Sequence, residues 1–92
     1  MSDTLHINDT LTTAGFTCEI SINPEPGVRN VDITGAGLDP VTGERRFDVA
    51  TDAARTLANA GYDILCYGSG LGAHGTIATL MVRRTAPAQR AA

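Results

Sequence analysis

The residues with the clearest potential for chemistry lie in a glycine-rich stretch, residues 68–75, which reads Gly-Ser-Gly-Leu-Gly-Ala-His-Gly. Its last six residues match the G-x-G-x-x-G pattern found where dinucleotides bind. That pattern requires a helix directly after the last glycine, because the helix N-terminus holds the pyrophosphate. Here a strand-like segment follows. We therefore expect no dinucleotide site and no cofactor.

The same stretch has two other interpretations, a simple hairpin connection and a binding surface. Glycine lets the backbone adopt conformations in which successive amides turn toward an anion. The segment is also richer in glycine than a tight turn requires. We therefore take it as the candidate loop for binding a partner or ligand, with Ser69, Gly70, Gly72, His74 and Gly75 as its members.

Neither histidine has the neighbours of a metal ligand or a catalytic base. His6 and His74 show no ligand spacing with Cys, Asp or Glu. A catalytic His74 would need an orienting carboxylate and a nucleophile, and the nearby hydroxyls belong only to Ser69 and Thr76. We predict no catalytic residues and no metal site, and a non-enzymatic role is favoured over an enzyme.

Cysteine usage and the N-terminal sequence predict a soluble, cytoplasmic protein. Cys18 and Cys66 are too few and too far apart for a disulfide framework, and both fall on strand positions where we expect core thiols. The first residues carry acids where a signal peptide would have a basic region. No apolar run approaches the roughly 18 residues of a membrane span, so no membrane partner is expected.

The arginines are the candidate basic contacts. Arginine supplies all seven basic residues, and four of them form two adjacent pairs, Arg45-Arg46 and Arg83-Arg84. A net charge of −3 and a pI near 5.1 argue against a general phosphate-backbone binder. Adjacent strand residues also point to opposite faces. Weak nucleic-acid binding through these arginines therefore remains only an alternative.

Two hairpin patterns frame the elements that must position these residues. Residues 16–22 and 28–34 alternate apolar and polar side chains around a turn that contains two prolines and a glycine. Residues 62–68 and 76–84 are rich in β-branched and apolar residues on either side of the glycine-rich loop. The sequence thus predicts four strands in two hairpins.

A helix pattern lies between the hairpins. Residues 49–60 carry Ala, Val and Leu with a period of 3.6, and this is expected to be the only substantial helix. Asp48 or Thr51 can cap its N-terminus, and Gly61 can end it. Residues 5–7 could add a short strand.

The predicted fold is a single small α+β domain with elements in the order β-β-α-β-β. It has a four-stranded, mostly antiparallel sheet with one helix on one face. The domain is expected to span residues 1–84, and residues 85–92 are expected to form a disordered tail.

One helix can cover only one face of such a sheet, whereas the second hairpin carries apolar residues on both faces. Either the N-terminal segment or a second subunit must cover the other face, and we favour a second subunit. The candidate dimer face comprises Leu65, Tyr67, Leu80 and Val82, or the residues of the opposite register if the helix covers that side.

These patterns favour a small, non-enzymatic protein-binding or regulatory module that forms a homodimer. It would present the 68–75 loop and the adjacent sheet surface to a partner protein whose identity the sequence does not reveal. The alternative is a module that binds a small anionic ligand through the loop amides.

Overall fold

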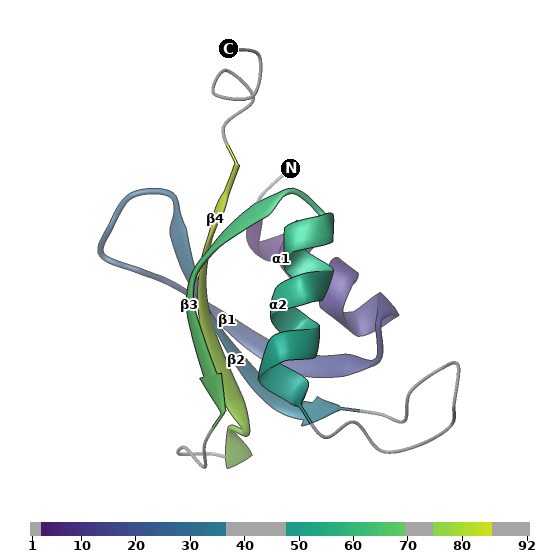
Figure 1. The fold of residues 1–92 in the computed structure, drawn as a ribbon. Coiled ribbons are helices and arrows are strands. Elements are labelled where there is room, and N and C mark those ends of the chain that lie inside the picture. The colour runs from purple at the N-terminus through teal and green to yellow at the C-terminus, as the bar shows by residue number, and fades with distance from the viewer. Residues whose placement is uncertain (1–2, 37–47, 70–74, 86–92) are drawn as a thin grey trace.

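The computed structural model describes residues 3–36, 48–69 and 75–85 of the 92-residue chain. Within these residues, helices and strands follow one another in the order α1-β1-β2-α2-β3-β4 (Figure 1). Their bounds are α1 Asp3–Thr13, β1 Phe16–Ile22, β2 Val28–Ala36, α2 Val49–Asn59, β3 Tyr62–Ser69 and β4 Ala78–Arg84.

The strands form one four-stranded sheet in the order β1-β2-β4-β3, and every neighbouring pair is antiparallel. Each predicted hairpin is present, and the two hairpins join through β2 and β4 at the centre of the sheet. The prediction of a small α+β fold with a four-stranded antiparallel sheet is confirmed.

Helix α2 forms where the 3.6-residue period predicted it. The Asp48 carboxylate accepts a hydrogen bond from the backbone N–H of Thr51 at 3.0 Å and another from its hydroxyl at 2.8 Å. These bonds lower the pKa of Asp48. Gly61 follows the helix with a φ of 99°, a left-handed conformation that glycine adopts at little cost. The buried stripe consists of Ala50, Ala53, Ala54 and Leu57.

Helix α1 corrects the prediction for the N-terminus. Residues 5–7 are helical, so a helix precedes the first strand, and α2 is not the only substantial helix. Ile7 and Leu11 lie one turn apart and are both fully buried, whereas Leu5 is 58% exposed. Residues 5–7 alternate apolar and polar side chains, which three residues can do in a helix as well as in a strand. Only the four-residue spacing from Ile7 to Leu11 indicates a helix.

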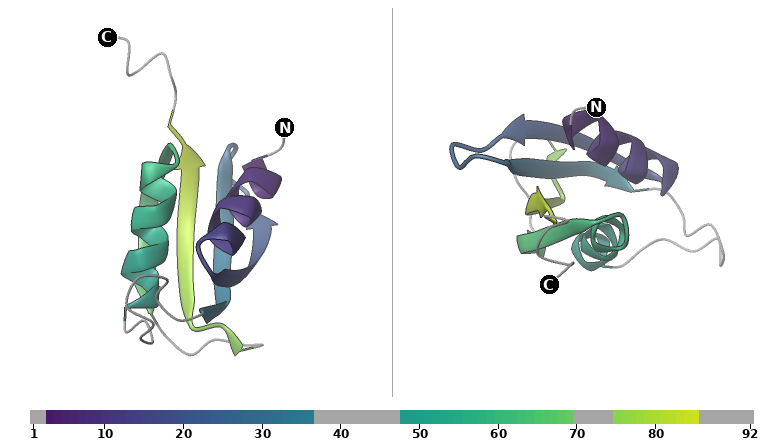
Figure 2. Two further views of the ribbon diagram at one scale, coloured as in Figure 1. Left: turned by 90° about the vertical axis from the view of Figure 1, so that its right-hand side faces the viewer. Right: turned by 90° about the horizontal axis from the view of Figure 1, so that it is seen from above.

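Both helices pack on the same face of the sheet. In the left view of Figure 2, α2 lies in front of β3, α1 lies in front of β1 and β2, and β4 is visible between the two helices. Their buried side chains join those of all four strands in one hydrophobic cluster. The prediction of a single helix on this face is therefore wrong. Among the described residues no helix lies on the opposite face, which we call the open face.

The end of the described chain is tied to the fold. The backbone N–H of Thr85 donates to the Gly61 carbonyl at 2.9 Å, and its hydroxyl donates to Asp63 at 2.7 Å. Residues 86–92 of the expected tail lie outside the described residues. Neither described helix is long and apolar enough to cross a membrane.

Candidate functional surface

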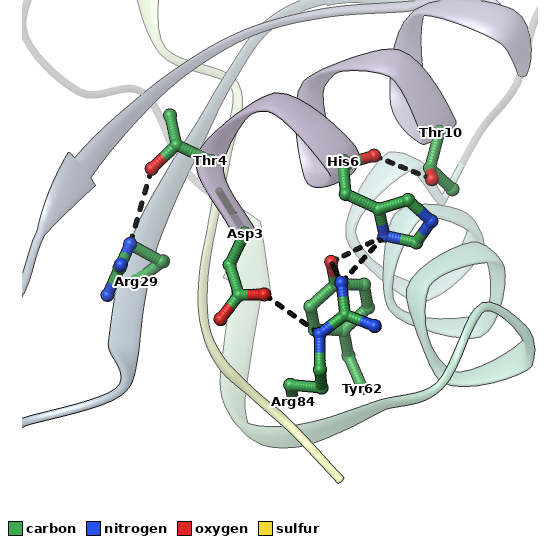
Figure 3. Close-up of polar contacts among 7 residues, drawn as sticks. All are labelled: Asp3, Thr4, His6, Thr10, Arg29, Tyr62 and Arg84. Carbon is green, nitrogen blue, oxygen red and sulfur yellow. Dashed lines mark hydrogen bonds and ion pairs between the residues drawn. The ribbon is translucent and has the colours of Figure 1, made fainter. Parts of the chain in front are cut away.

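Four polar side chains meet where the first turns of α1 lie over the ends of β3 and β4 (Figure 3). Tyr62 begins β3, and its hydroxyl lies 2.6 Å from Nδ1 of His6. Arg84 ends β4 and donates through Nη2 to the same hydroxyl at 3.0 Å. Its Nε donates to the Asp3 carboxylate at 2.8 Å. These contacts form a polar clasp of Asp3, His6, Tyr62 and Arg84.

The hydrogen bonds of the clasp define the role of each group. Because Arg84 donates to the Tyr62 oxygen, the Tyr62 hydroxyl is placed to donate to His6 Nδ1, which favours the tautomer with the proton on Nε2. Burial raises the pKa of Tyr62, more than the charge of Arg84 lowers it. The hydroxyl therefore stays protonated and acts as a hydrogen-bond donor.

The clasp is built to hold α1 in place. The Arg84 guanidinium also lies 5.0 Å from the centroid of the Tyr62 ring, a cation–π distance. On the other side of the helix, Arg29 of β2 donates through Nε to the Thr4 hydroxyl at 3.2 Å. The polar side chains of Asp3, Thr4 and His6 thus attach the first turns of α1 to the sheet. Across the described segments, no group of three or more His, Cys, Asp or Glu side chains could hold a metal.

The open face offers a second set of groups. In the register of β2 and β4, Val28 pairs with Arg83, Asn30 with Met81, and Asp32 with Thr79. The residues between them, such as Val31 and Leu80, are buried under the helices. Because successive side chains of a strand alternate between the two faces, the three pairs lie on the open face.

An apolar strip lies on the β3–β4 half of this face. The register shift between Ile64 and Cys66 is a β-bulge, so Leu65 and Cys66 both oppose Met81. Ile64 packs against the core, Leu65 is 40% exposed, and Cys66 is exposed. We define the apolar strip as Leu65, Cys66 and Met81.

Charged side chains flank the apolar strip. Glu19 and Asp32 are paired on β1 and β2 at one end of the face, and Arg83 lies on β4 at the other end. Within the described part of the chain, neither the Asp32 nor the Arg83 side chain has a hydrogen bond or ion pair. These two opposite charges thus have no side-chain partner within the described ranges.

The end of the open face near Arg83 is closely packed. Val28 is fully buried although it belongs to this face and not to the helix-side cluster. The Asn23–Val28 turn closes next to it, and the aliphatic part of Arg83 runs beside Gly27. Arg83 is thus positioned by its contact with the turn that joins β1 and β2.

The predicted dimer residues do not share one exposed surface. Leu80 and Val82 are 2% and 0% exposed in the core, so the helices cover the side of β4 that the prediction left open. Leu65 and Tyr67 are exposed, but Tyr67 pairs with Leu80 and lies on the helix side of the edge strand β3. The bulge at Leu65 causes this, because it resets the alternation of every residue after it.

The prediction that both cysteines are core thiols is wrong for Cys66. Cys18 is half-buried against the core, and its thiol donates to the Asn8 side chain at 3.6 Å. Burial raises the pKa of this thiol. Cys66 is exposed on the open face, because the bulge moves it away from the core.

The candidate loop and the arginine pairs are only partly described. Ser69 ends β3 opposite Ala78, and Gly75 follows with a φ of 79°, whereas Gly70, Gly72 and His74 lie outside the described residues. Arg45 and Arg46 also lie outside them. Arg83 and Arg84 point to opposite faces of the sheet, as the alternation predicted, and Arg84 is engaged by Asp3.

Comparison with known proteins gives no relative: no family model, no curated protein and no solved structure matches the chain. Function must therefore be inferred from the geometry of the open face and of the polar clasp.

Proposed function

We propose that this chain is a small, non-enzymatic protein-binding module whose binding surface is the open face of its sheet. The observation that carries the proposal is that both helices pack on one face of the sheet, while the other carries the apolar strip. Apolar groups grouped on an exposed surface and rimmed by polar residues are typical of protein-binding sites.

The chemistry of the face favours a protein over a nucleic acid. Among the described residues of this face, Arg83 is the one arginine, and it shares the face with three acids, Glu19, Asp32 and Asp63. A phosphate backbone would meet more negative than positive charge there. A protein surface can instead bury the apolar strip and pair with charges of both signs.

The clasp supports a non-enzymatic role. Its histidine, tyrosine and arginine satisfy one another, and the Tyr62 side chain is buried under α1. A catalytic base must reach a proton on a bound substrate. The groups of the clasp are instead used to attach a helix.

Site-specific photo-crosslinking in the producing cells tests the proposal. A photoreactive residue in place of Met81 lies in the middle of the open face, and one in place of Arg55 lies on the exposed side of α2 as a matched control. We expect a discrete crosslinked protein from position 81 and none from position 55. Equal patterns at the two positions would contradict a binding role for this face.

A further inference from the structure

We infer that the protein bound on the open face is a second copy of this chain, packed sheet against sheet about a two-fold axis. This inference rests on the proposed binding role of that face and names its partner. It follows from the arrangement of apolar and charged residues about the centre of the face, which is complementary to itself.

The apolar strip can cover its own copy. Asn30, Met81 and Cys66 occupy one row across the strands, because Met81 pairs with Asn30 on β2 and with Cys66 on β3. A two-fold axis lying between two sheets along this row brings each residue of the row near the same residue of the partner. Met81, Leu65 and Cys66 then meet apolar groups, and the amide of Asn30 meets another amide.

The same axis brings opposite charges together. Asp32 lies one row to one side of the axis on β2, and Arg83 lies one row to the other side on the adjacent strand β4. The two-fold rotation exchanges the two sides, so Asp32 of one copy approaches Arg83 of the other, and this contact occurs twice. Both side chains lack a partner among the described residues of their own chain.

The nearest competing acid on the same chain is already engaged. Asp63 pairs with Arg83 in the register of β3 and β4, but its carboxylate accepts a hydrogen bond from the Thr85 hydroxyl. The described residues contain no ion pair between Asp63 and Arg83. Arg83 thus has no ion-pair partner among the described residues of its own chain, and the proposed dimer supplies one in Asp32 of the other copy.

The size of the face sets the expected affinity. Four strands about 4.8 Å apart and seven residues long give a face of roughly 19 by 23 Å. Side chains add to this plan area of roughly 450 Å², against a standard of about 800 Å² buried per partner. We therefore expect a dimer that dissociates in the micromolar range, so association must be measured over a series of concentrations.

Charge reversal tests the two-fold arrangement. We expect the Asp32→Arg and Arg83→Asp variants each to weaken self-association at least about tenfold in sedimentation equilibrium, because each brings two pairs of like charges together. When the two variants are mixed, each contact between position 32 of one chain and position 83 of the other again joins an arginine to an aspartate. The mixture should therefore associate with nearly the affinity of the wild type, as should the double variant.

The controls separate folding from association. Both changes are on the surface, so thermal unfolding at low protein concentration should be close to that of the wild type. Reversing the charge of Arg55, on the exposed side of α2, should leave association unchanged. Failure of the mixed variants to associate would overturn the two-fold arrangement.

The outcomes also distinguish this inference from the proposed function. A wild-type chain that stays monomeric at about 100 µM, well above the expected dissociation constant, would overturn the inference. If position 81 still crosslinks to a different protein, the binding role of the open face stands. If neither self-association nor a specific crosslink is found, both proposals fail.

Discussion

On the helix side of the sheet, the central strands contribute Val31, Ile33, Leu80 and Val82, each at most 2% exposed. Their immediate neighbours on the open face include Asn30, Asp32, Thr79 and Met81. The sheet thus carries two different surfaces, one packed against helices and one made of an apolar strip between charges. The sheet is thus held by helices on one side, and we propose that the other side binds a partner.

The largest expected contrast compares Leu80 with Met81, which are adjacent in sequence and lie on opposite faces. Leu80→Asp places a carboxylate in the core and should reduce the free energy of unfolding by about 4 kcal/mol or more. Met81→Asp should change it by less than about 1 kcal/mol in the monomer. Urea denaturation at low protein concentration measures both.

Equal losses from Leu80→Asp and Met81→Asp would break the comparison, because Met81 would then be covered from within the chain. The expected second effect of Met81→Asp is on binding alone. It should remove the crosslink or the self-association while the fold persists.

The next contrast lies on α1, between its buried and exposed sides. Ile7→Ala removes a fully buried side chain and should cost about 2–4 kcal/mol, whereas Leu5→Ala removes a side chain that is 58% exposed and should cost less than about 0.5 kcal/mol. Thermal or urea unfolding of the two variants gives the difference. A small effect of Ile7→Ala would show that α1 is not part of the cooperative core.

The elements with a long and regular pattern could be predicted from the sequence. Strand β1 has the predicted bounds, residues 16–22, because its alternation is uninterrupted. Helix α2 combines an alanine-rich stripe with a cap at Asp48 and a glycine at 61. Tertiary packing agrees with the local pattern along most of both elements, and the exception is the last residue of β1, Ile22, which is 75% exposed.

The errors arise where one residue decides the outcome. Helix α1 presents only Ile7 and Leu11 to the core, which is too few for a clear period. The exposed side of the second hairpin differs from the prediction for two reasons. The helices cover the side of β4 that carries Leu80 and Val82. The bulge at Leu65 also reverses the alternation in β3, and nothing in Ile-Leu-Cys-Tyr marks a bulge. The clasp joins residues from opposite ends of the chain, a contact that no spacing in the sequence reveals.

A smaller effect is expected from the clasp that fastens the helix side. Tyr62→Phe keeps the ring in the core but removes the hydroxyl shared by His6 and Arg84, and we expect a loss of about 1–2 kcal/mol. Hydrogen exchange should show that the substitution accelerates amide exchange in α1 more than in α2. Uniform changes in both helices would mean that the clasp contributes to general stability and does not specifically hold α1.

Thiol labelling compares the two faces of the sheet without any substitution and is expected to leave the fold unchanged. Cys66 on the open face should react rapidly with a thiol reagent in the native protein. Cys18 is half-buried, and burial raises its pKa above the ordinary value of 9.0, so at pH 8 it carries less of the reactive thiolate. Labelling of Cys18 should therefore be slow at pH 8 and should accelerate only at a higher pH than is usual for a thiol.

Protein concentration makes the labelling a test of the open face. If a second copy covers that face, labelling of Cys66 should slow as the concentration rises through the dimer dissociation constant, while Cys18 keeps its rate. In the Arg83→Asp variant, Cys66 should label at the same rate over the same range of concentration. A Cys66 rate that is independent of concentration in a wild type known to associate would place the interface away from the apolar strip.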